Sequence, residues 1–90
     1  MRLIVGFHTA QRLIAMGPQD AIAYQSLQQE MMDKLDQAGF TSEYLEVRRN
    51  TDLQPPQAGD KGLVLLVSAW LGKARLIDNV QVLLGSGEII

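Results

Sequence analysis

The chain of 90 residues contains no cysteine, which excludes both disulfide bonds and thiolate metal sites. It has no excess of basic charge: 8 Lys and Arg face 10 Asp and Glu, for a net charge of −2, so nothing favours a nucleic-acid or anionic membrane partner. No apolar run approaches the roughly 20 residues that a membrane helix needs. The lack of cysteine fits a reducing compartment, and we expect a cytoplasmic protein.

Apolar residues make up 47% of the chain, enough for the modest core of one small domain. Their spacing of three and four residues predicts two amphipathic helices in the first half. The first extends from about Arg2 to Met16, with its apolar stripe at Leu3, Phe7, Ala10 and Ile14. Gly17 and Pro18 end it, and Pro18 can open the second helix, with Asp20 near the positive end of that helix. The second stripe consists of Tyr24, Leu27, Met31, Leu35 and Ala38, and Gly39 ends this helix.

After Gly39 the apolar period changes to two, which predicts strands. Leu45 and Val47 alternate with polar residues in a half-buried strand, and a Pro- and Gly-containing loop follows. The continuous apolar run LVLLVSAW predicts a central strand. A short turn with Gly72 at its centre then leads into a third strand. In that strand Leu76, Val80 and Val82 share one face with Asp78, while Arg75, Ile77, Asn79 and Gln81 share the other.

The element order α-α-β-β-β predicts an α+β fold of two layers, a helical hairpin packed on a small, three-stranded, mainly antiparallel sheet. We expect one domain over residues 1–84 and a flexible tail over residues 85–90. No internal repeat is visible.

The pair Gly72-Lys73 invites comparison with a phosphate-binding loop. That motif needs an earlier glycine separated by four residues from the Gly-Lys pair, a Ser or Thr after the lysine and a helix behind it. Val67 and Ala74 occupy the first two positions, and a strand pattern follows. We therefore interpret the pair as a hairpin turn with an exposed lysine.

The remaining polar residues do not assemble into a catalytic or metal-binding pattern. Arg75 and Asp78 lie three apart on a strand and so face opposite ways, and we expect Arg75 to reach a carboxylate on a neighbouring strand or domain. By the same spacing Glu43 and Glu46 do not share a face. His8, the only histidine, has no acid near it and is expected at the surface or boundary. No residue is assigned as catalytic, cofactor-binding or metal-binding.

Several short motifs carry a resemblance to a known family. They are Gly39-Phe40, Tyr44–Arg48, Leu53–Pro55, Ser68–Gly72 and Ala74–Asn79, the last two lying within the string SAWLGKARLIDN. This pattern resembles the C-terminal domain of the pantothenate synthetases, the pantoate–β-alanine ligases, over about residues 2–80. Arg49 and Asn50 depart from it, standing where that family usually has acids.

The resemblance implies a parent ligase that forms pantoyl-adenylate from pantoate and ATP with magnesium, then joins β-alanine to give pantothenate and AMP. That family's histidine-containing ATP motif and its Ser-Ser-Arg-Asn loop belong to a larger N-terminal nucleotide-binding domain and are absent from these residues. The resemblance thus implies a lid domain, with no cofactor of its own, that closes over that N-terminal partner. Lys73, Arg75, Asp78 and Asn79 are the candidate interdomain contacts. In part of the family a cytidylate kinase follows, and the tail GSGEII fits either a linker or a cloning boundary.

Two hypotheses remain open. In the first, the chain is this lid and contributes closure rather than catalytic groups, so that alone it is inactive. In the second, it is a stand-alone interaction or dimerisation module with the same fold and no ligase role. A homodimer is compatible with either hypothesis.

Overall fold

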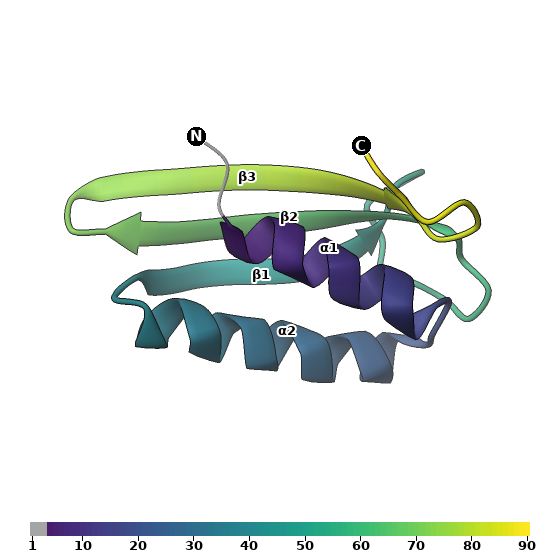
Figure 1. Ribbon diagram of the computed structural model, residues 1–90, viewed down its shortest axis with the longest axis horizontal. Helices are drawn as coiled ribbons and strands as arrows, with labels where there is room; N and C mark the ends of the chain where they lie inside the picture. The colour runs from purple at the N-terminus through teal and green to yellow at the C-terminus, as the bar shows by residue number, and fades with distance from the viewer. Residues whose placement is uncertain (1–3) are drawn as a thin grey trace.

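The computed structural model describes residues 4–90 as two helices followed by four strands (Figure 1). The strands form one antiparallel sheet in the order β1-β2-β3-β4, and both helices pack on the same face of it. The α+β fold of two layers is therefore confirmed. The elements are α1 (Ile4–Met16), α2 (Ala21–Gln37), β1 (Thr41–Arg49), β2 (Gly62–Leu71), β3 (Ala74–Leu83) and β4 (Glu88–Ile89).

Helix α1 confirms part of the expected stripe, since Ala10 is buried and Ile14 packs against the core, but the rest of its buried face differs. Its buried residues are Gly6, Thr9, Ala10 and Leu13, whereas the side chain of Phe7 is 44% exposed. The reason is close packing on β3, because a Cβ atom added to Gly6 would lie 3.2 Å from Val80 Cγ2. Small residues let the helix approach the strand this closely, and the large apolar residues turn partly outward. Arg2 and Leu3, also assigned to this helix, lie outside the described residues.

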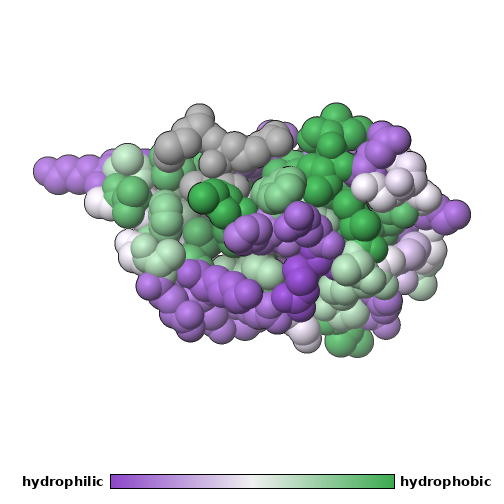
Figure 2. Space-filling view, in the orientation of Figure 1, coloured by the Kyte–Doolittle hydropathy of each residue, from purple (hydrophilic) through white to green (hydrophobic). Residues whose placement is uncertain are grey.

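Helix α2 begins at Ala21 and not at Pro18, because Asp20 is its N-cap. The Asp20 Oδ1 atom accepts a hydrogen bond from the Ala23 N–H at 3.0 Å, which satisfies one of the donors left unpaired at a helix start. The expected stripe is confirmed at Tyr24, Leu27, Met31 and Leu35, which are buried, but not at its last member, Ala38, which is the exposed C-cap residue after the helix. Hydrophilic residues gather over much of the outer surface of this helix (Figure 2).

The core lies between the helices and the inner face of the sheet. Successive side chains of a strand alternate between its two faces, and the register of the strands places the buried residues in common rows. The strand residues of the core are Leu45, Val47, Leu63, Leu65, Val67, Ala69, Val80 and Val82. As expected, β2 is the central strand with β1 and β3 on either side.

The sheet has one strand more than the three expected. Glu88 and Ile89, in the segment assigned to a flexible tail, form β4 and pair with Leu83 and Val82 of β3. Gly87 (φ 72°) turns the chain back on itself, which is the physical reason that so short a segment reaches the sheet. Neither helix of residues 4–90 has the length and apolar character required to cross a membrane.

Candidate site on the open face of the sheet

The sheet face opposite the helices is covered by no helix or strand of residues 4–90, and we call it the open face. Strand alternation and register assign its residues. They are Tyr44, Glu46 and Arg48 of β1, Val64, Leu66, Ser68 and Trp70 of β2, and Arg75, Ile77, Asn79 and Gln81 of β3. The face thus combines aromatic, aliphatic and charged side chains.

Four polar side chains meet near the hairpin end of this face, and we call them the Glu43 cluster: Glu43, Ser68, Trp70 and Arg75. The Glu43 Oε1 atom accepts hydrogen bonds from Ser68 Oγ at 2.7 Å and from Arg75 Nε and Nη2 at 3.0 and 2.6 Å. Its Oε2 atom accepts a longer one, 3.4 Å, from Trp70 Nε1. One carboxylate therefore orients groups from β2 and β3 at once.

A β-bulge brings Glu43 onto this face. The register of β1 against β2 shifts between Ser42 and Tyr44, so Glu43 is the inserted residue and the alternation is displaced there. The expectation that Glu43 and Glu46 lie on different faces is therefore wrong. The two carboxylates nevertheless have different cationic partners, since Glu46 Oε2 accepts a hydrogen bond from Arg48 Nη2 at 2.6 Å. A bulge has no clear signature in one sequence, so spacing alone could not reveal it.

The expected carboxylate partner of Arg75 is thus Glu43. It lies two strands away and not on the adjacent strand, because Ser68 and Trp70 of β2 stand between β1 and β3. The hydrogen bond from Ser68, which has the largest effect, and the hydrogen bonds from Arg75 hold the pKa of the Glu43 carboxyl below its ordinary value. A carboxylate kept ionised in this way accepts hydrogen bonds and is a poor general acid. Ser68 is fully buried, so its hydroxyl is not presented to a substrate.

The cluster therefore positions groups instead of transferring protons. Two N–H donors of Arg75 are used by Glu43, and the guanidinium, with its side chain 43% exposed, keeps its Nη1 side without a hydrogen bond to any described residue. A planar guanidinium fixed in this way can receive a carboxylate or phosphate from a surface that docks against it. Trp70, 37% exposed beside it, adds a flat apolar surface.

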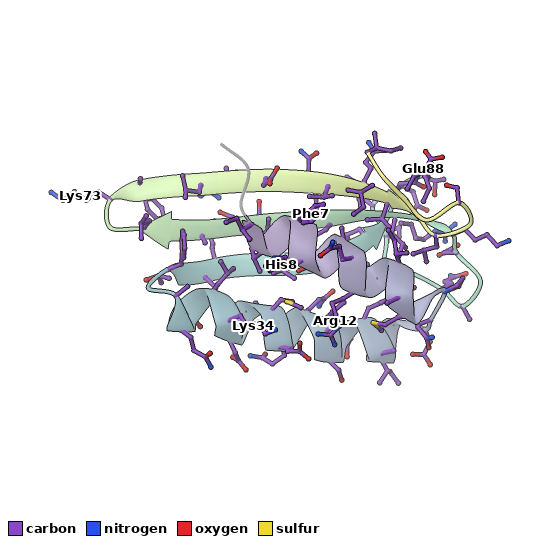
Figure 3. All side chains as sticks on the ribbon, in the orientation of Figure 1. Phe7, His8, Arg12, Lys34, Lys73 and Glu88 are labelled. Carbon is purple, nitrogen blue, oxygen red and sulfur yellow. The ribbon has the colours of Figure 1, made fainter. Side chains whose placement is uncertain are left out.

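The structure separates the other expected contact residues. Asn79 lies with Arg75 on the open face, whereas Asp78 lies on the helix-facing side near Gly6, with its Oδ1 accepting from the Asn79 N–H at 2.9 Å. Arg75 and Asp78 therefore do face opposite ways, as expected. Lys73 projects beyond the tip of the β2–β3 hairpin (Figure 3). Gly72 begins that two-residue turn with φ 62°, which confirms a hairpin and not a phosphate loop.

Shallow grooves lie on the helix side of the described part of the chain, residues 4–90. One, of about 180 Å³, lies between the start of α2, β1 and the loop at Pro55. Another, of about 280 Å³, lies between the helices at His8, Arg12 and Lys34, all three labelled in Figure 3. Arg12 and Lys34 there share the carboxylate of Glu30. Both volumes fall below the roughly 300–1,000 Å³ of most ligand pockets.

Comparison with known proteins assigns the chain to a family. The profile of the Pantoate-beta-alanine ligase family matches residues 5–81. A pantothenate synthetase of Shewanella oneidensis is 44% identical over 68 residues, which are 76% of this chain and 24% of that protein. One of Chromobacterium violaceum is 48% identical over 66 residues, 73% of this chain and 23% of that protein. The chain thus spans about a quarter of the length of these relatives. It belongs to the pantoate-beta-alanine ligase family.

Proposed function

We propose that this chain is the lid domain of an ATP-dependent pantoate–β-alanine ligase. In this proposal the parent activates pantoate as pantoyl-adenylate and transfers the pantoyl group to β-alanine, releasing AMP. The reacting groups belong to a larger nucleotide-binding domain, and the present chain supplies closure and the exclusion of water. The relatives' names and the share of their length that this chain covers support the proposal. The cysteine-free composition is compatible with a cytoplasmic parent.

The observation that carries the proposal is the open face with its Glu43 cluster. Glu43 holds Arg75 by two hydrogen bonds, so little side-chain entropy is lost when that guanidinium meets a partner surface. Within residues 4–90 no three His, Asp or Glu side chains gather closely enough to hold a metal ion. These residues do not fit a magnesium site, and we assign no metal ligand to them.

Complementation in trans tests the proposal. The 90-residue chain would be mixed with a Shewanella oneidensis pantothenate synthetase lacking the region that matches it, and pantothenate would be measured with pantoate, β-alanine, ATP and magnesium. We expect product only when both pieces are present. Product from the chain alone, or none from the mixture while both pieces are folded, would contradict the lid role.

A matched pair of variants connects this activity to the open face. Arg75→Ala should lower the complemented rate about tenfold or more, because one charge-assisted hydrogen bond contributes about 1.5–3 kcal/mol. Lys34→Ala removes one exposed cation on the helix side of the sheet and should leave the rate nearly unchanged. Equal rates for the two variants would show that closure does not use the open face.

The alternative function is a stand-alone interaction module. Exposed apolar side chains on the helix side favour it, since Ile4 is 72% and Ile22 74% exposed. The gene sequence upstream of the Met1 codon distinguishes the two functions. A continuous reading frame that encodes a nucleotide-binding domain supports the lid, and a start codon at Met1 supports the module.

A further inference from the structure

The groove between the two helices is lined by cationic and neutral side chains. Among residues 4–90 its lining consists of His8, Gln11 and Arg12 of α1 with Met31 and Lys34 of α2, and none of these is acidic. His8 and Arg12 lie four residues apart on α1 and so share one face of that helix. In Figure 3 the labelled His8, Arg12 and Lys34 lie between the helices. The whole chain has a net charge of −2, so this gathering of basic groups is a local feature and does not follow from composition.

One carboxylate orients two of these cations from outside the groove lining. Glu30 accepts hydrogen bonds from Arg12 Nη1 and, at 3.3 Å, from Arg12 Nη2, and its Oε2 atom lies 3.7 Å from Lys34 Nζ. These contacts join α1 to α2. The hydrogen bond from Arg12 also lowers the pKa of the Glu30 carboxyl, so Glu30 stays ionised. One carboxylate cannot balance two cations, and one positive charge therefore remains at the groove.

The other acidic side chains of α2 are bonded elsewhere. Asp33 Oδ1 accepts a hydrogen bond from Gln29 Nε2 at 2.9 Å, and Asp36 Oδ1 accepts one from the Ser42 N–H at 3.1 Å. His8 is exposed and has no hydrogen bond to any other residue of the described range, so the N–H group of its ring is available to a ligand. The groove thus offers donors from both helices and carries no acid of its own.

We propose that this groove binds a phosphate monoester, with His8, Arg12 and Lys34 each donating to a terminal oxygen. A phosphomonoester carries about two negative charges and three strong acceptor oxygens, which matches three donors supplied by two helices. A carboxylate has one charge and two oxygens, so it would leave one donor unused. The groove, of about 280 Å³, has room for the phosphate and a small organic substituent. Because the site is exposed and salt screens its charges, binding is weak, with a Kd on the order of 1 mM.

The proposal does not depend on the lid function. The groove lies on the helix side and the Glu43 cluster on the open face, so a partner that docks on the open face leaves the groove accessible. Loss of a groove side chain should therefore weaken phosphate binding without changing the complemented ligase rate, in agreement with the rate expected of Lys34→Ala. The two proposals can thus fail separately.

An NMR titration of the isotopically labelled 90-residue chain tests the proposal. The probes are inorganic phosphate, glycerol phosphate, acetate and a short glutamate peptide, all at one constant ionic strength. The pH is kept above the second pKa of phosphate, so that the two phosphate probes are dianions. We expect both of them to give saturable shifts at His8, Arg12 and Lys34, and acetate to bind at least about tenfold more weakly.

A matched pair of variants distinguishes this site from general charge attraction. Lys34→Gln and Lys73→Gln each remove one exposed lysine charge, and Lys73 projects from the hairpin tip, away from the groove (Figure 3). We expect Lys34→Gln to weaken phosphate binding about threefold or more and Lys73→Gln to leave it unchanged. His8→Ala removes a donor without altering any lysine or arginine, and it should weaken binding as well. If Lys34→Gln does not fold, His8→Ala is compared with Lys73→Gln in its place.

Four results would overturn the proposal. They are shifts that do not saturate by about 20 mM phosphate, acetate binding as tight as that of phosphate, and equal phosphate affinities for the groove variants and Lys73→Gln. The fourth is tighter binding of the glutamate peptide than of glycerol phosphate at the groove, which would indicate an acidic protein partner.

Discussion

Truncating three leucines of β2 to alanine tests how the core is divided between the two faces of the sheet. Leu65 is fully buried between the sheet and the helices. Leu66, its neighbour, is half-buried on the open face, and Leu71 is 48% exposed at the end of the strand. Leu65→Ala should lower the free energy of unfolding by about 2–5 kcal/mol, because it removes a buried side chain and leaves a cavity. Leu71→Ala should cost about 1 kcal/mol or less, and Leu66→Ala an intermediate amount.

The loss expected from Leu65→Ala is large compared with the total free energy of unfolding of the chain. A chain of this length is stable by about 5–13 kcal/mol, so Leu65→Ala removes a substantial part of that margin. Urea unfolding followed by circular dichroism would give the three free energies, with equal m-values as the check on two-state behaviour. Each kcal/mol should also lower Tm by about 4–8 °C. If Leu66→Ala destabilised as much as Leu65→Ala, the open face would be covered in solution, and our description of it would be wrong.

Three further predictions concern single polar or glycine positions. Ser68→Ala should raise the pKa of Glu43 toward its ordinary value in a carbon-13 NMR titration, and an unchanged pKa would contradict the role given to Ser68. Because the folded pKa of Glu43 is lowered, its ionised form stabilises the fold above its ordinary pKa, and that contribution is lost as pH falls from the ordinary pKa through the folded pKa. In this variant the loss should therefore be smaller and should be complete at a higher pH. Asp20→Ala should cost about 0.5–2 kcal/mol in urea unfolding as a lost N-cap, with Asp20→Asn close to wild type. Gly72→Ala should cost about 1 kcal/mol because φ is 62°, while Gly85→Ala, which meets only an ordinary contact, should be nearly neutral in the same assay.

The spacing of apolar residues predicted correctly those elements whose buried face consists of large apolar side chains. In α2, Tyr24, Leu27, Met31 and Leu35 are all large and apolar, so the buried stripe is visible in the sequence. The same holds for β2, whose continuous apolar run marks a central strand. In α1 the rule identified Ala10 correctly but included the partly exposed Phe7 and missed Gly6, because the contact with β3 requires small residues and a hydrophobicity pattern does not count them.

The site was harder to predict than the fold. The sequence indicated that Arg75 needs a carboxylate, but the β-bulge that supplies Glu43 is a displacement of register, which depends on the pairing of β1 with β2. Strand β4 was missed for a related reason. Two residues are too few to show alternation, and they are held by pairing with β3 and not by any local preference.

Because α2 is hydrogen-bonded to the edge of β1, the exposure of that strand edge and the exposure of the core are coupled to each other. Gln28 and Asp36 close the β1 edge, while Leu27 and Leu35 on the same helix close the core. If α2 detaches in a local opening, an unpaired strand edge and an apolar sheet face become exposed in the same step. That opened form has both features of a seed for β-aggregation. The aggregation rate of this chain should therefore follow the population of the α2-detached form more closely than global unfolding.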